Sequence, residues 1–160
     1  MTNNDVLRGM RYALALSTAA LAEIFSLSGQ MVAQDKIVNL LKKDEEEGFI
    51  VCTDALIEDF LSGLIIYRRG RQNDKPARPP QTIETITNNS ILKKLRIALI
   101  LQESDMLGIL QQAGNPVSKS ELSALFRKAG HNNYKECGDQ FLRNFLKGLA
   151  LRCRKTTHPR

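Results

Sequence analysis

The amino-acid sequence predicts an all-α protein made of two tandem copies of a four-helix unit. When the sequence is compared with itself at an offset of 85 residues, residues 2–69 align with residues 87–154 without a gap, and 20 of the 68 pairs are identical. Aliphatic residues recur at intervals of three and four, as on one face of an α-helix, and no stretch alternates with the period of two typical of a strand. Each copy is therefore expected to form the same bundle.

The first two helices of each copy have recognisable ends. The first helix follows a Thr-Asn-Asn sequence, whose side-chain oxygens can accept hydrogen bonds from the free amides of the first turn. The second helix is expected to end at a glycine in the left-handed conformation. The predicted N-caps are Thr2 or Asn4 and Thr87 or Asn89, and the predicted C-terminal glycines are Gly29 and Gly114.

The third and fourth helices follow after a short turn and a polar loop. Ser118-Lys119-Ser120-Glu121 has the spacing of a capping box at the start of the third helix in the second copy. Asp54 and Asp139 are the predicted caps of the fourth helix. Gly63 and Gly148 lie inside that helix, where glycine costs about 1 kcal/mol relative to alanine. A tight helix crossing is the favoured explanation, and contact with a ligand is the other.

The composition also predicts where the copies end. The first copy spans 2–69 and the second spans 87–154. Between them, residues 70–86 contain Pro76, Pro79 and Pro80, which disfavour helix and predict an extended linker. The tail, 155–160, has no apolar periodicity and is expected to be disordered.

Several classes of function have no support in the sequence. No apolar run has the length of a membrane span and the N-terminus has no signal-like segment, so we expect a cytoplasmic protein without a membrane partner. Cys52, Cys137 and Cys153 are widely spaced and are expected to be free thiols, with the first two packed in the core. No carboxylate pair, nucleophile motif, phosphate loop or metal-ligand spacing is present, so we expect no cofactor, no metal and no enzymatic activity.

The two copies differ in charge, which points to nucleic acid. The first has 7 Lys/Arg against 10 Asp/Glu, and the second has 11 against 5. The second and third helices of each copy resemble a helix-turn-helix pair, whose second helix enters the major groove of DNA. We therefore expect a regulator that binds DNA or RNA through the basic second copy. The candidate contact residues are Lys119, Ser120, Ser123, Arg127, Lys128, Lys135, Arg143, Lys147, Arg152 and Arg154.

A protein-interaction module is the alternative. The acidic run Asp44–Glu47 follows the third helix of the first copy and would repel DNA. Opposite charges could instead join the first copy to the second, within one chain or between two copies of this chain or with another protein. Drift of charges on solvated faces would produce the same asymmetry.

Particular residues also carry a family resemblance. The motifs are Thr-Asn-Asn-Asp-Val-Leu at residues 2–7, Thr87-Asn88-Asn89, Ser118–Lys128 and Tyr134–Leu151, the last containing the specific stretch Glu136–Gly148. In these the chain resembles the YehS-like family of small bacterial proteins, whose function is not established. Gly9, where a basic residue like Lys94 is expected, and Ala129, where proline is typical, depart from the pattern. The resemblance implies the duplication and brings no activity, cofactor or catalytic residue.

Overall fold

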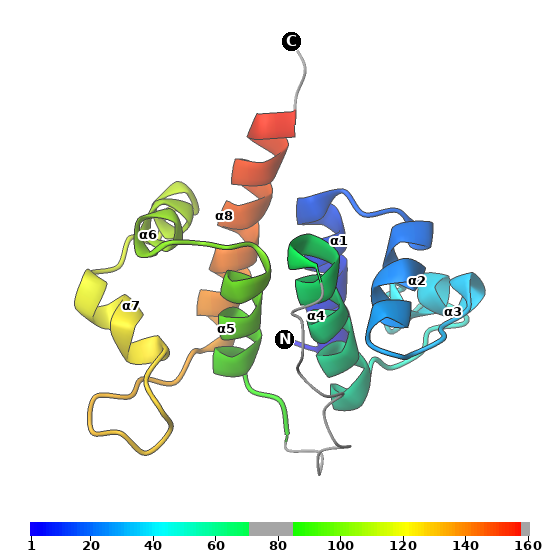
Figure 1. Ribbon diagram of the computed structural model, residues 1–160, viewed down its shortest axis with the longest axis horizontal. Coiled ribbons are helices and arrows are strands. Elements are labelled where there is room, and N and C mark those ends of the chain that lie inside the picture. Colours follow the sequence, from blue (N-terminus) through cyan, green and yellow to red (C-terminus); the bar gives the residue numbers. More distant parts are fainter. Residues whose placement is uncertain (71–84, 158–160) are drawn as a thin grey trace.

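The computed structural model describes residues 1–70 and 85–157, with side chains described as far as Arg154, and this part of the chain forms eight helices (Figure 1). The helices of the first repeat are α1 (Asn3–Leu14), α2 (Thr18–Leu27), α3 (Gln34–Leu40) and α4 (Asp54–Arg69). Those of the second repeat are α5 (Asn88–Ala98), α6 (Glu103–Gln112), α7 (Lys119–Leu125) and α8 (Asp139–Thr157). The described ranges contain no strand, so the predicted all-α class is confirmed.

The chain differs from the prediction at its C-terminal end. Helix α8 continues beyond Arg154 to Thr157, so the predicted disorder is wrong for residues 155–157. Nothing in those three residues breaks a helix, and extension of an existing helix adds one hydrogen bond for each residue ordered. Residues 158–160, and residues 71–84 of the predicted linker, lie outside the described residues.

Threonines provide the caps at three helix starts. Thr2 caps α1 and Thr87 caps α5, each by accepting from an amide in the first turn. Thr53 is the N-cap of α4, and α8 begins at Asp139, so Asp54 and Asp139 are first helical residues rather than the predicted caps. Their carboxylates instead each accept a hydrogen bond of 2.8 Å from the first asparagine of a Thr-Asn-Asn sequence.

The second asparagine of each Thr-Asn-Asn holds a loop inside the repeat. Asn4 is buried, and its side chain donates to the carbonyls of Leu40 and Ile50 and accepts from the amide of Cys52, each at 2.9 Å. Asn89 makes the equivalent three bonds in the second repeat. Of the two alternatives predicted for each N-cap, Thr2 and Thr87 are therefore the caps, and Asn4 and Asn89 are not. Both satisfy backbone groups that burial would otherwise leave unpaired.

Glycines set the packing within each repeat. Helix α4 packs on α2 and α8 packs on α6. A Cβ built on Gly63 would lie 1.9 Å from the carbonyl oxygen of Ile24, and one built on Gly148 would lie 2.1 Å from that of Ile109. These helix backbones approach so closely that no larger residue fits without movement.

The second helix of each repeat ends at a glycine. Gly29 and Gly114 have φ of +94° and +81° and follow the C-cap residues. In both cases the amide of the next residue donates to the carbonyl five positions upstream, which is the bond of a Schellman motif.

The repeats pack against each other through their first and fourth helices. Helix α1 lies along α8 and α5 lies along α4, so each first helix contacts the other repeat's fourth helix more extensively than its own (Figure 1). Buried side chains of both repeats form one hydrophobic core. Two ion pairs cross between the repeats: Lys94 with Glu58, and the N-terminal amino group with Asp139 at 2.7 Å. The contact of α1 with α8 and the contact of α5 with α4 are therefore equivalent, and exchanging the two repeats replaces one by the other, as a two-fold rotation does.

Candidate nucleic-acid interface

Helix α7 turns a polar face outward. Its N-cap Ser118 accepts from Glu121 N at 3.1 Å, and Leu122 and Leu125 point into the core. Of the remaining positions of the predicted recognition helix, Ala124 is half-buried, and Glu121 and the candidate contact residues are exposed. These exposed candidates are Lys119, Ser120 and Ser123, with Arg127 and Lys128 in the turn that follows.

Two of the basic candidates are paired with carboxylates. Lys135 Nζ lies 3.9 Å from Glu121 Oε2, and Arg152 Nη2 lies 2.9 Å from Asp105 Oδ1. A hydrogen bond from Gln102 N and the bond from Arg152 hold the pKa of Asp105 below its usual value. Both cations are therefore partly neutralised by their partners.

Five other basic candidates are exposed and, within the described part of the chain, form no ion pair. They are Lys119, Arg127, Lys128, Arg143 and Lys147. Arg143 donates to the Oε1 atom of the neighbouring Gln140 at 3.1 Å. Hydrogen bonds from the N-terminal amino group and from Asn88, together with the charge of Arg143, hold the pKa of Asp139 below its usual value. The five side chains are the source of a positive potential on the second repeat.

Helix α8 carries part of this charge along one stripe. Arg143, Lys147, Leu151 and Arg154 recur at intervals of three and four and are all exposed, because the other faces of the helix contact α1 and α6. Of the ten predicted contact residues, Lys147 and Arg154 are brought together with residues of α1 at a groove of about 810 Å³. The candidates of α7 do not line this groove.

The groove contains residues that sequence reasoning missed. They are Arg8, Gly9 and Tyr12 of α1, Gln112 of α6, and Leu146, Ala150 and Leu151 of α8. Tyr12 lies off the aliphatic stripe of α1, and an aromatic residue on a polar helix face was the sequence feature that could have marked it as a candidate. The net charge of each repeat pointed elsewhere, because α1 belongs to the acidic repeat but packs beside basic α8.

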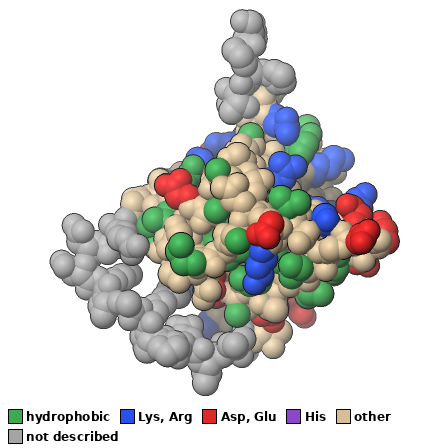
Figure 2. Space-filling view, turned by 90° about the vertical axis from the view of Figure 1, so that its right-hand side faces the viewer, with side chains coloured by type: hydrophobic (Ala, Val, Ile, Leu, Met, Phe, Trp, Pro, Cys, Tyr) green, Lys and Arg blue, Asp and Glu red, His purple; other side chains and the backbone are tan. Residues whose placement is uncertain are grey.

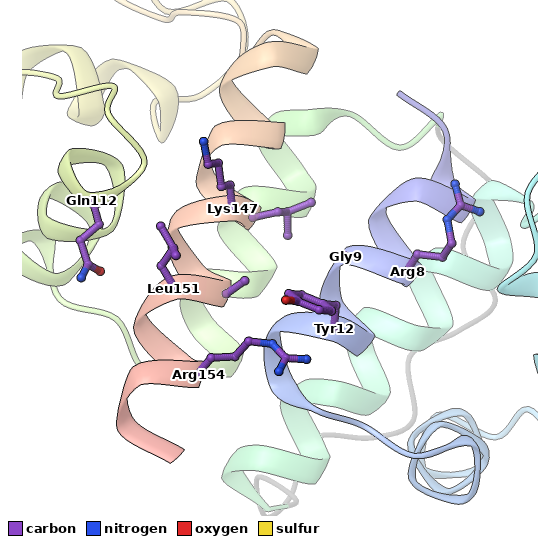
Figure 3. Close-up of a pocket in the computed structure, with 9 residues that line it drawn as sticks. Arg8, Gly9, Tyr12, Gln112, Lys147, Leu151 and Arg154 are labelled. Atoms are coloured by element: carbon purple, nitrogen blue, oxygen red, sulfur yellow. The ribbon is translucent and has the colours of Figure 1, made fainter. Parts of the chain in front are cut away.

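Tyr12 and Arg154 face each other across the groove (Figure 3). The guanidinium carbon of Arg154 lies 3.8 Å from the centre of the Tyr12 ring, a cation–π contact. Tyr12 is nevertheless 53% exposed and Leu151 is 46% exposed. In the view of Figure 2, Lys and Arg side chains gather at the upper right beside hydrophobic ones.

Arg8 stands at the rim and is held by its own repeat. It donates to the Lys42 carbonyl at 2.8 Å and pairs with Asp5. Burial opposes ionisation of Asp5, but hydrogen bonds from Thr2 and the charge of Arg8 outweigh it and lower the pKa of that carboxyl. Arg8 therefore borders the groove as a fixed, compensated cation.

The cysteines are unsuited to nucleophilic chemistry. Burial, reinforced by the adjacent aspartate, raises the pKa of Cys52 to about 12 and that of Cys137 to about 11. Burial also raises the pKa of half-buried Cys153. Across the described ranges no group of His, Cys, Asp and Glu side chains could hold a metal ion, and no single helix is long and apolar enough to cross a membrane.

Comparison with known proteins agrees with the resemblance seen in the sequence. The family model described as "Protein of unknown function (DUF1456)" matches residues 3–70 and again residues 88–155, one match for each repeat. The chain is also similar to "Uncharacterized protein YehS" of Escherichia coli (strain K12), with 43% identity over 152 residues that cover 95% of this chain and 96% of that protein. No solved structure matched the chain.

Proposed function

We propose that this chain, which belongs to the DUF1456 family of proteins of unknown function, is a non-enzymatic cytoplasmic protein that binds nucleic acid through the cationic surface of its second repeat. The observation that carries the proposal is the set of five exposed Lys and Arg side chains without a carboxylate partner in the described residues. Phosphates that these cations neutralise would release condensed counterions, the main source of affinity for a nucleic-acid backbone.

The exposed face of α7 supports the same proposal. Its outward side chains are Lys119, two serines and Glu121, and Arg127 and Lys128 follow in the next turn. Serine and lysine can donate to base edges or to phosphate oxygens, and these three cations outnumber the single carboxylate of the face. Helix α7 spans only Lys119–Leu125, about 10 Å, so it would contact a short stretch of nucleic acid.

The test is a titration of labelled DNA and RNA at two salt concentrations. We expect binding at about 50 mM salt, and the logarithm of the binding constant should fall linearly with the logarithm of the salt concentration. The double variant Lys119→Glu, Arg127→Glu should weaken binding and lower the salt slope by roughly one for each phosphate that is no longer neutralised. The matched control, Lys36→Glu with Lys43→Glu, makes the same charge change at exposed positions of the first repeat.

Two outcomes would refute the proposal. One is the absence of binding at about 50 mM salt, where the electrostatic contribution is strongest. The other is equal loss of affinity in the control and in the α7 double variant, because the overall charge would then explain it without any local surface.

Self-association is a second candidate, favoured by the exposure of the acidic run Asp44–Glu47 in the first repeat. Because this run and the unpaired cations of the second repeat both face outward, one chain could dock head-to-tail on the next. Light scattering should then show assemblies that dissociate as salt rises. A monomer at low salt would contradict this candidate and leave the nucleic-acid proposal untouched.

A further inference from the structure

We infer that the groove between α1 and α8 takes a segment of single-stranded nucleic acid, with a base against Tyr12 and phosphates against the cations of α8. The inference rests on the proposed function, because it specifies which form of nucleic acid one part of the surface selects. Four features carry it: a broken symmetry between the repeats, the space that results, an exposed aromatic ring and the charge around it.

The symmetry is broken at the two equivalent contacts between the repeats. Where α5 lies along α4, Lys94 pairs with Glu58, and burial lowers the pKa of that lysine. The equivalent positions where α1 lies along α8 are Gly9 and Arg143. One contact is therefore closed by an ion pair, whereas at the other the cation of α8 has no side chain opposite it at the equivalent position of α1.

Small residues line the groove at this contact. Gly9 and Ala150 border the groove where the other contact has Lys94 and Ile65. A Cβ built on Gly9 would lie 3.2 Å from Leu146 Cδ1, so the glycine lets α1 sit close to α8 and leaves no side chain of its own in the groove. The resulting volume of about 810 Å³ lies within the usual range of ligand sites, roughly 300–1,000 Å³.

The lining matches a base joined to a phosphate. Tyr12 offers a half-exposed aromatic ring, Leu151 offers an exposed aliphatic wall, and Arg154 lies over the ring. Bases stack on such aromatic and guanidinium planes. Arg143, Lys147 and Arg154 extend along about 16 Å of α8, long enough to follow several successive phosphates.

This lining favours a single strand over other anions. In a duplex the bases are stacked inside and cannot stack on the Tyr12 ring. An acidic peptide could pair with the cations, but it would bring no planar group to Tyr12.

The experiment uses the full chain and fluorescein-labelled oligothymidylate of about 16 nucleotides, beside a duplex of the same length. Tyr12→Ala should weaken single-strand binding about fivefold or more and leave duplex binding unchanged, because stacking on one aromatic side chain is lost. Tyr12→Phe should bind as the wild type does. The matched control is Ile97→Ala at the equivalent, partly exposed position of α5.

A direct reporter is also available, since the chain contains no tryptophan. In Tyr12→Trp the fluorescence of the single indole should be quenched by the oligonucleotide, and polyglutamate of equal charge should not reverse the quenching. Circular dichroism of each variant shows whether it is folded.

The outcomes separate this inference from the proposed function. Suppose that the wild type binds nucleic acid, that the α7 double variant binds it more weakly, and that Tyr12→Ala and Ile97→Ala have the same affinity for the single strand. The groove inference is then overturned and the proposed function stands. Equal loss of duplex and single-strand binding in Tyr12→Ala, or displacement of the strand by polyglutamate, would also overturn it. If the wild type binds no nucleic acid, both fail.

Discussion

Replacing Gly63 by alanine should destabilise the protein, although alanine is the better helix former. Gly63 lies in the middle of α4, where the helix crosses α2. An added Cβ would lie 1.9 Å from the carbonyl oxygen of Ile24, whereas a carbon and a carbonyl oxygen in contact stay about 3.3 Å apart. Because both partners at this contact are backbone, α2 and α4 would have to separate by about 1.4 Å.

The expected loss follows from that separation. A gap of 0.5–1 Å already forfeits roughly a quarter to a half of each dispersion contact, and overpacking of cores costs about 1–3 kcal/mol, sometimes more. A clash with rigid backbone belongs at the top of this range. The gain in helix propensity returns about 1 kcal/mol. The net change in the free energy of unfolding should be a loss of about 2 kcal/mol, or about 4–8 °C in melting temperature.

Urea unfolding followed by circular dichroism measures this loss. Gly108→Ala is the matched control, because Gly108 also lies inside a helix but has no atom within 4 Å of the added Cβ. The control should gain about 1 kcal/mol from propensity alone. If Gly63→Ala is as stable as Gly108→Ala, the close helix crossing does not explain the glycine and the reasoning is refuted.

Three further predictions concern buried polar groups and titrating ones. Asn89→Ala should lower the free energy of unfolding in urea by about 3 kcal/mol, since two buried backbone groups and one half-buried one lose their partner. A loss under about 1 kcal/mol would show that water replaces the amide. In native protein at about pH 8, iodoacetamide should label Cys153 before Cys52 and Cys137, because the two buried thiols, with pKa values of about 12 and 11, have little thiolate. In urea all three cysteines should be labelled. Early labelling of either buried thiol, seen in a peptide map, would contradict this prediction. The pKa of Asp105 in the folded protein lies below its ordinary 3.8, so the ionised carboxylate stabilises the fold above pH 3.8, and this stabilisation is lost as the pH falls through the folded pKa. The difference in melting temperature between the wild type and Asp105→Asn should therefore shrink in acid. A constant difference would argue against the ion pair.

Local patterns in the sequence predicted much of the fold. The offset of 85 residues and the aliphatic spacing predicted eight helices in two repeats, and the structure has them in its described ranges. Thr2, Thr87 and Gly114 stand where helices begin and end, because capping depends on atoms within about one turn. The local pattern could not decide between Thr2 and Asn4 as the cap, and it wrongly favoured Asp54, because any polar side chain near a helix start can accept from the first-turn amides. Only the folded chain shows which of these side chains bind other partners instead.

The candidate site was predictable only in part. Exposure of Lys119 and Ser123 followed from the period of α7, which turns the leucines inward, whereas Arg127 lies beyond the end of the helix. The neutralisation of Arg152 by Asp105 did not, because the two residues are 47 positions apart. Tyr12 was missed for the same reason, since its neighbour Arg154 comes from the other repeat.

By itself the sequence determined the repeat, the helices, several of their ends and the glycines at which they cross, because these depend on short-range periodicity and on residues that must suit both copies. The tertiary structure decided which helices meet. By packing α1 on α8 and α5 on α4 it joined the basic side of one repeat to the exposed tyrosine of the other. That choice depends on buried area summed over distant segments, which no local pattern contains. It also shows that the two equivalent contacts differ, since Lys94 pairs with Glu58 at the first while Gly9 borders the groove at the second.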